Sequence, residues 1–325
     1  MADLSIVPAE GDVLRQILAT TYKIWNDGLD RAAYGRFYAA QRATPWGRRH
    51  LDRLALVDGG TVLASAKLYT FDATLDHHPI RIVGLGAIFA QPEHRGRGAA
   101  RDLVGRLLRR AVDDGADLAL LFSEIGPGYY ARLGFTAIDT HDVQLRVAES
   151  ARHGAPMTMV RGGEERDFAD IAAMGAARAA PFRFHLDRDP DLVHYAIAKR
   201  RLLAGLGRPG AREIQFFVAE EGASAVAYVV ISRHRDEWTI DECGDRDPSG
   251  ARLGALLQVL IARDPAERRP SIRTSLAPGF VPPQVSVSAS ERSADVMMVR
   301  ALSAKGAAAT SLTEPEILYW RSDRF

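Results

Sequence analysis

Apolar residues recur with two different spacings in the first part of the chain, and the spacing predicts the secondary structure. Between Asp12 and Leu29 they fall three or four positions apart, which predicts a helix with one buried face, and a second helix is expected over residues 30–40. Two β-rich runs flank Asp58-Gly59-Gly60, which predicts a hairpin of strands. A further strand is expected over 81–89, after a polar loop at 72–79.

The helical spacing returns after Gly98, where Leu103, Val104 and Leu107 share one face. A buried strand over 118–122 and a short helix over 127–133 are expected next, and a last strand near 143–147 closes this half.

The same order of elements then begins again, which indicates a degenerate duplication. The expected elements are strands at 158–160, 214–219, 225–232, 238–243, 272–276 and 297–301, and helices at 165–177, 190–206 and 249–262. Residues 149–155 are small and polar without an apolar period, so we expect the boundary between two α/β domains there. The predicted domains are residues 1–150 and 151–325.

Composition narrows the classes of function. The 42 Lys and Arg nearly balance the 41 Asp and Glu, for a net charge of +1, so no overall field attracts nucleic acid or anionic lipid. Cys243 is the single cysteine, which excludes an internal disulfide and a thiolate zinc site. Without a secretion signal or a run of roughly 20 apolar residues, the expected location is the cytoplasm, away from membranes.

A glycine-rich turn joins the strand at 81–89 to the helix after Gly98. It contains Arg95, Gly96, Arg97, Gly98, Ala99 and Ala100. A helix N-terminus preceded by glycines offers free backbone N–H groups and positive potential, which suit a pyrophosphate. Arg101 stands where a dinucleotide-binding fingerprint needs a small residue, and the Gly-Lys-Ser/Thr ending of a P-loop is absent. The alternative to a phosphate-binding site is a turn whose glycines serve tight packing alone.

These residues resemble the signature of the GNAT superfamily of N-acetyltransferases, Gln/Arg-x-x-Gly-x-Gly/Ala, through Arg95, Gly98 and Ala100. Downstream, residues 128–135 (GYYARLGF) are similar to the family's aromatic-Tyr-x-x-Leu-Gly-Phe ending. The resemblance covers residues 4–147. It implies an α/β GNAT fold, with a mixed, mostly antiparallel sheet flanked by helices, followed here by a second GNAT-like domain.

The resemblance also implies a chemistry, in which acetyl-CoA donates its acetyl group directly to a primary amine. The strand end at Ile88, Phe89 and Ala90 would hold the pantetheine and stabilise the oxyanion, and the turn at 95–100 would hold the pyrophosphate. Tyr130 matches the tyrosine that protonates the leaving thiolate, although it could simply pack in the core. Glu124 is the best-placed base, with water as the alternative.

The equivalent turn of the second half, residues 245–250 (DRDPSG), has two acids and a proline in place of the glycine cradle. This half is therefore expected to be a degenerate GNAT domain that shapes the acceptor site. The run 123–130 is also similar to the fungal lysine acetyltransferase family. The aromatic C-terminus, Tyr319 to Phe325, is expected to be docked, and resemblance to the enhanced intracellular survival family would make the Phe325 carboxylate a catalytic group.

Several alternatives stay open. A non-catalytic acyl-CoA-binding scaffold would keep the same turn. The adjacent His77 and His78 point to opposite faces of an extended chain and lack a third ligand, so no metal is expected. The acceptor is a small-molecule amine or a lysine-bearing substrate, and acyl length and oligomeric state are not determined by the sequence.

Overall fold

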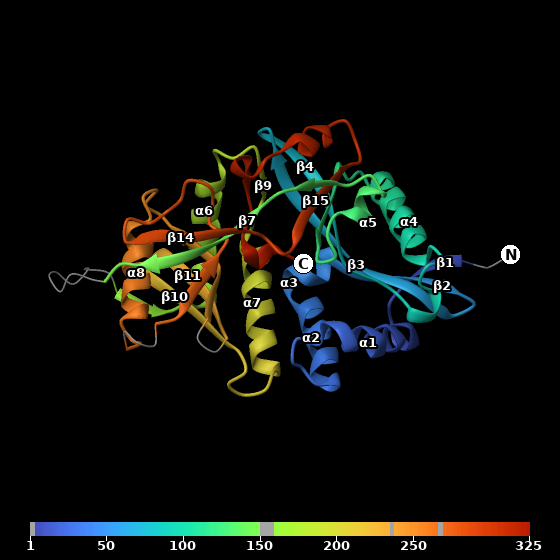
Figure 1. Cartoon of the computed structure of the whole chain (residues 1–325), viewed down its shortest axis with the longest axis horizontal. Coiled ribbons are helices and arrows are strands. Elements are labelled where there is room, and N and C mark those ends of the chain that lie inside the picture. The colour runs from blue at the N-terminus through green and yellow to red at the C-terminus, as the bar shows by residue number, and fades with distance from the viewer. Residues whose placement is uncertain (1–3, 150–158, 235–236, 266–268) are drawn as a thin grey trace. The chain divides into compact units, whose positions relative to one another are not determined.

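A computed structural model of the chain describes residues 4–149, 159–234, 237–265 and 269–325 (Figure 1). Contacts divide the chain into two compact units, each with its own sheet. The first unit comprises residues 1–139, 294–313 and Phe325, and the second comprises 140–293 and 314–324. In the described part of the chain, no helix is both long and apolar enough to cross a bilayer.

The sheet of the first unit has the strand order β1-β2-β3-β4-β5-β15-β6. Strands β4 and β5 run parallel and the other neighbours run antiparallel. The strands are β1 Leu4–Pro8, β2 Leu51–Asp58, β3 Thr61–Leu75, β4 His78–Ala90, β5 Leu118–Ser123, β6 Thr136–Ile138 and β15 Val296–Ala301.

Helices cover both faces of this sheet, because side chains alternate between the faces along each strand. On β2, Leu54 and Leu56 pack in a core with α4, whereas Ala55 and Val57 pack with α1. Figure 1 shows α4 and α1 on opposite sides of these strands. The helices are α1 Gly11–Trp25, α2 Arg31–Ala43, α3 Pro45–His50, α4 Ala99–Asp113 and α5 Gly128–Ala131, with 3₁₀ turns η1 Pro92–His94 and η4 Ala307–Ser311.

The second unit repeats this plan. Its sheet has the order β8-β10-β11-β12-β13-β7-β14, with β12 and β13 parallel. The strands are β7 His141–Val147, β8 Met159–Gly162, β10 Glu213–Glu221, β11 Ser224–His234, β12 Glu237–Asp245, β13 Ser271–Thr274 and β14 Val285–Arg292, and β9 Phe184–Leu186 pairs with β16 Ile317–Leu318. The helices are α6 Phe168–Ala179, α7 Pro190–Leu206 and α8 Ala251–Ile261, with 3₁₀ turns η2 Glu165–Asp167, η5 Glu314–Glu316 and η6 Arg321–Asp323.

The expected duplication is confirmed by these matching strand orders, but the two sheets exchange one strand. The strand expected to close the first half, β7, lies in the second sheet between β13 and β14. Conversely, β15, expected in the second half, lies in the first sheet between β5 and β6. The prediction that β7 belongs to the first half and β15 to the second was therefore wrong. An apolar run such as Met297 to Val299, which is fully buried, predicts a strand but does not predict which strand it pairs with.

The prediction of a loop at 72–79 is also wrong, since β3 and β4 extend through most of these residues. Phe71, Ala73 and Leu75 are buried, and the chain reverses tightly at Asp76 and His77, which have φ values of 49° and 63°. That geometry is the hairpin turn that matches strand twist. The boundary expected at 149–155 lies mostly outside the described residues, and the division into a catalytic domain 1–150 and an accessory domain 151–325 stays a prediction.

Candidate active site

Strands β4 and β5 pair over only a short stretch before they separate. The parallel pairing runs from Ile82 with Leu118 to Gly84 with Leu120. From Leu85 to Ala90, β4 continues without a described strand partner on its β5 side. Backbone N–H and C=O groups on that edge are therefore available to an extended ligand, apart from the Ala90 carbonyl, which accepts a 3.4 Å hydrogen bond from Arg95 Nε.

A bulge in β4 lies in this separated stretch. Ser65 pairs with Phe89 and Lys67 with Gly86, so Ala87 and Ile88 together oppose a single residue of β3. Ala87 has a φ of 46°, an unusual conformation for a residue with a Cβ. Such bulges redirect the backbone near functional sites. Of the residues expected at the strand end, Ile88 and Ala90 are half-buried, whereas Phe89 is buried and packs edge-on against Trp25.

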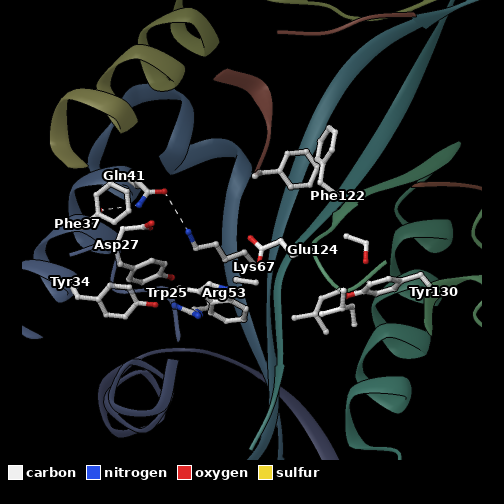
Figure 2. A pocket seen from close by; sticks show the side chains of 16 residues that line it. Trp25, Asp27, Tyr34, Phe37, Gln41, Arg53, Lys67, Phe122, Glu124 and Tyr130 are labelled. Carbon is white, nitrogen blue, oxygen red and sulfur yellow. Dashed lines mark hydrogen bonds between the residues drawn. The ribbon is translucent and has the colours of Figure 1, made fainter. Parts of the chain in front are cut away.

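A cavity of about 270 Å³ lies beside the bulge (Figure 2). Ala87 and Ile88 line it together with Tyr130, Glu124 and Phe325, so three of the residues predicted to act in catalysis share one cavity. Aromatic side chains from α1 and α2 form much of the remaining wall. They are Trp25, Tyr34, Phe37 and Tyr38.

Tyr130 lines this cavity while its ring packs in the core beside α4. The ring lies edge-on to Tyr129 and Phe135, at centroid distances of 5.0 and 6.1 Å. Burial is the main cause that raises the pKa of Tyr130 to about 12, and Tyr129 and Glu124 add to it. The hydroxyl therefore stays protonated at physiological pH, as a proton donor requires.

Glu124 follows β5 directly and is exposed at the cavity (Figure 2). The turn that holds it is tied by the Ser123 hydroxyl, which donates a 2.6 Å hydrogen bond to the Gly126 carbonyl. A solvated carboxylate beside a cavity is suited to accepting a proton from a bound amine.

Phe325 packs in the first unit against bare backbone on β4. A Cβ built at Gly84 would lie 2.6 Å from the Phe325 ring, and a Cβ at Gly86 would lie 3.2 Å from its carbonyl carbon. Rings of Tyr69 and Phe71 lie 4.6 and 5.3 Å away. The expectation of a docked aromatic terminus is confirmed, and the two glycines are what leave room for it.

The predicted phosphate turn has the conformation that its glycines allow. Gly96 and Gly98 have φ values of 74° and 84°, and a Cβ at either would meet open space. Gly98 is the N-cap residue of α4, and no side-chain hydrogen bond caps this helix. The first N–H groups of α4, including those of Ala99 and Ala100, are thus available to an anion. Arg95 and Arg97 belong to the same exposed turn.

A groove of about 560 Å³ begins at Gly98 and is lined by guanidinium groups. Arg101 and Arg109 come from α4, Arg132 follows α5, and Arg300 comes from β15. Four cations beside an open helix N-terminus attract a polyanionic ligand.

In the second unit, acidic side chains occupy the corresponding helix start. Gly250 is the N-cap of α8 with a φ of 75°, so it is the structural counterpart of Gly98. This correspondence was not identified from the sequence. Asp245 accepts hydrogen bonds of 2.8 Å from the backbone N–H groups of Leu253 and Asp247. The helix N-terminus is satisfied from within the chain, and its carboxylate would repel a phosphate.

A buried ion cluster in the second unit surrounds Glu242 of β12, next to a bulge in the pairing of β12 with β11. Arg188 donates to both oxygens of Glu242, at 2.7 and 2.9 Å, and its Nε lies 3.2 Å from Asp323. Tyr228 and Ser322 also donate to Glu242.

Sequence reasoning missed two cavity cations, Arg53 and Lys67, and the paired glycines of β4. Both cations lie in strands whose residues are mostly apolar and buried. A charged residue within an apolar strand indicates a buried charge, and this feature of the sequence could have identified them. Gly84 and Gly86 have the two-residue period of one sheet face, which indicates close approach of another group.

Comparison with known proteins identifies the domain family that part of the chain matches. Residues 14–138 match the family model described as the acetyltransferase (GNAT) domain. Comparison with curated protein sequences gave no match. Among solved structures, a GCN5-related N-acetyltransferase from Kribbella flavida is 20% identical, with a TM-score of 0.67 over 95% of this chain and 74% of that chain.

Two further structures share the arrangement. Eis1 from Mycobacterium abscessus is 16% identical, with a TM-score of 0.56 over 94% of this chain and 75% of that one. A tandem GNAT protein from the clavulanic acid biosynthesis pathway is 14% identical, with a TM-score of 0.53 over 93% and 99%. At these identities the likeness concerns the fold.

Residues 14–138 thus match the acetyltransferase (GNAT) domain family, and the fold of the whole chain resembles that of a tandem GNAT protein, with two GNAT-like halves. The match of residues 14–138 supports N-acyltransferase activity.

Proposed function

We propose that the chain is an acetyl-CoA-dependent N-acetyltransferase that acetylates a primary amine at one active site, in its first unit. One observation carries the proposal. The β4 and β5 strands separate beyond Gly84 and Leu120, a cavity lined by Tyr130 and the β4 bulge lies there, and β4 leads through the glycine turn into the uncapped N-terminus of α4.

The donor would bind along this path. The free β4 edge at 88–90 suits the amides of pantetheine, and the turn from Arg95 to Ala100 suits the pyrophosphate. The arginine-lined groove beside Gly98 supplies positive charge for the phosphate groups. At the corresponding helix start of the second unit, Asp245 accepts a hydrogen bond from the N–H of Leu253 in α8 and would repel a phosphate.

In the proposed reaction the amine attacks the thioester carbon, so a C–N bond forms and the C–S bond breaks. Backbone N–H groups at the bulge stabilise the oxyanion, and Tyr130 donates its proton to the departing sulfur. The amine loses its proton to Glu124, to the carboxyl group of Phe325, or to water. Burial raises the pKa of the Cys243 thiol to about 12, so this cysteine of the second unit is unsuited to forming an acyl-enzyme.

The acceptor is a small-molecule amine or a lysine side chain that enters the cavity of about 270 Å³. The test is release of free CoA from acetyl-CoA with a panel of amines, followed by mass spectrometry of the product. Amine-dependent thiol release with a mass increase of one acetyl group supports the proposal. Tight acetyl-CoA binding without turnover of any amine would instead favour a non-catalytic scaffold.

A further inference from the structure

Two cations stand side by side in the wall of the cavity. Arg53 on β2 and Lys67 on β3 are directly opposed in the antiparallel register. Both side chains reach the same ring, since the Arg53 guanidinium lies 5.3 Å and the Lys67 ammonium 5.9 Å from the centre of Tyr38. Like charges placed directly opposite on neighbouring strands are destabilising unless something compensates them.

No carboxylate in the described residues forms an ion pair with either cation. Arg53 is only 3% exposed, yet its Nε and Nη2 atoms have no hydrogen-bond partner. Lys67 has one hydrogen bond, of 3.5 Å, to the amide oxygen of Gln41. Burying an unpaired guanidinium is costly, so a site of this kind is suited to a ligand that supplies the negative charge.

Lys67 lies on β3, the strand next to the proposed reaction centre on β4, and Arg53 lies on β2, the strand beside β3. Lys67 pairs with Arg53 on one side and with Gly86, next to the bulge, on the other. Adjacent strands lie about 4.8 Å apart, so an anion held at these cations and an amine at the bulge can belong to one small molecule. Figure 2 shows Lys67 and Arg53 on the α2 side of the cavity and Tyr130 on the other.

The side-chain carboxylates that line the cavity are closer to solvent than Arg53. Asp27 and Glu124 are exposed, whereas Arg53 is buried. The interior therefore disfavours a polycationic acceptor and favours an anionic one, and the aromatic walls favour an apolar body. The Nε and Nη2 donors on one edge of the Arg53 guanidinium have no partner but are covered by protein. A shift of the side chain must therefore bring that edge to the cavity before it can bind the two oxygens of a carboxylate.

We infer that the acceptor is an amine that also bears a carboxylate, such as a free amino acid, and that Arg53 and Lys67 bind that carboxylate. The inference rests on the proposed acetyl transfer at this site. It assigns Arg53 and Lys67 to substrate selection, a role that catalysis by Tyr130 does not require.

The test compares matched acceptors. Amino acids are assayed with acetyl-CoA beside their own amides and decarboxylated amines, and aminoalkyl phosphates are assayed beside amino acids of equal length. Because a charge-assisted hydrogen bond is lost with the carboxylate, kcat/KM should be about 10–100-fold higher for the acid than for its amide. Preference for the aminoalkyl phosphates would overturn the assignment to a carboxylate.

Variants separate charge from packing. Lys67→Met should remove most of the preference for the acid, Lys67→Arg should keep it, and Lys67→Glu should move the preference toward diamines. Arg53→Gln should raise KM for the acid more than for its amide. The matched control is Arg15→Gln, which removes an exposed cation on α1 that pairs with Asp12.

Two failures can be told apart. If acetyl-CoA binds but no amine is turned over, the proposed function fails. If amines are acetylated but acids and amides react equally, and Lys67→Glu changes nothing, the carboxylate inference alone fails. Calorimetric titration with acetyl-CoA should give the same affinity in all these variants, because neither cation lies at the phosphate turn.

Discussion

Gly98 and Gly250 have the same position and the same left-handed backbone in their two units, each immediately before the helix that follows the fourth strand of its sheet. Their surroundings differ. The helix after Gly98 begins without a capping side chain, whereas Asp245 accepts a hydrogen bond from the third residue of the helix after Gly250. The duplicated geometry is kept, but one copy has an acidic residue where the other offers an anion site.

The first prediction concerns this difference. Calorimetry should find one acetyl-CoA site per chain, and Gly98→Glu should weaken binding by about 100-fold, close to 2.7 kcal/mol, because a carboxylate would face the pyrophosphate. Gly115→Glu is the matched control. Gly115 also has a positive φ, of 80°, and open surroundings, but it lies beyond the C-terminal end of α4.

Two equivalent sites per chain would contradict the assignment of a single donor site to the first unit. Equal weakening by both glutamate variants would show that backbone strain, rather than charge at the helix N-terminus, causes the loss.

The second prediction is that Tyr130→Phe lowers kcat by roughly 10²–10⁴-fold with little change in acetyl-CoA affinity, the usual contribution of a positioned general acid. Since burial raises the pKa of Tyr130 to about 12, the wild-type rate should show no loss from its ionisation below about pH 11. Tyr129→Phe is the control, because its ring lies against Tyr130 but its hydroxyl has no proposed role. A full rate in Tyr130→Phe would make Tyr130 a packing residue.

The third prediction follows from Lys67. Burial, followed by the charge of Arg53, lowers its pKa to about 7, against an opposing effect of Asp27. Tyr38 and Glu124 also line this cavity. Below pH 7 the ammonium is charged and binds a carboxylate, and above it this attraction is lost.

An N-acetylated amino acid, the expected product, has no amine to titrate and stays anionic above about pH 5. Its Kd should therefore rise by about 10-fold between pH 6 and pH 9, with the midpoint moved above 7 by the bound anion. Lys67→Arg keeps its charge and should give a flat profile. A wild-type profile as flat as that of the variant would place the Lys67 charge outside the binding site.

The fourth prediction concerns stability. Burial alone would raise the pKa of Asp142, but the hydrogen bond from Ser275 and the charges of Arg321 and Arg324 outweigh it and lower the pKa to about 2. Since the folded-state pKa lies below the unfolded value of about 3.9, the stabilisation is complete above pH 4 and is lost as pH falls toward 2. It amounts to about 2.6 kcal/mol.

Asp142→Asn should destabilise the second unit by about 3 kcal/mol at pH 7, because buried or half-buried arginines lose their anion. Thermal unfolding followed by tryptophan fluorescence measures the loss. The gap between wild type and variant should narrow near pH 2. A gap that is constant from pH 7 to pH 2 would mean that the Asp142 charge is not what stabilises the unit.

Local elements were predictable from the sequence because they depend on short-range patterns. The helix Pro190–Leu206 has the bounds that its apolar period predicts, and the hairpin around Gly59 and Gly60 turns where expected. The phosphate turn was equally accessible, since strand, glycines and helix are contiguous.

The rest depends on pairing between distant segments. Nothing in residues 296–301 indicates that they complete the first sheet, because register and partner are set by tertiary contacts. The same limit applies to the cavity. Arg53 and Lys67 become neighbours only through the β2–β3 register, and Gly84 and Gly86 acquire their purpose only when Phe325 packs on them.

The exchange of β15 into the first sheet has a consequence for biosynthesis. Residues 4–138 leave the ribosome first, yet the strand between β5 and β6 is encoded at 296–301. The half that is translated first is thus completed only after residue 301 has emerged, and β5 and β6 keep unpaired edges until then. A nascent chain with such late closure depends on slow, long-range pairing, and a gene fragment cut at the midpoint would encode a sheet without its sixth strand.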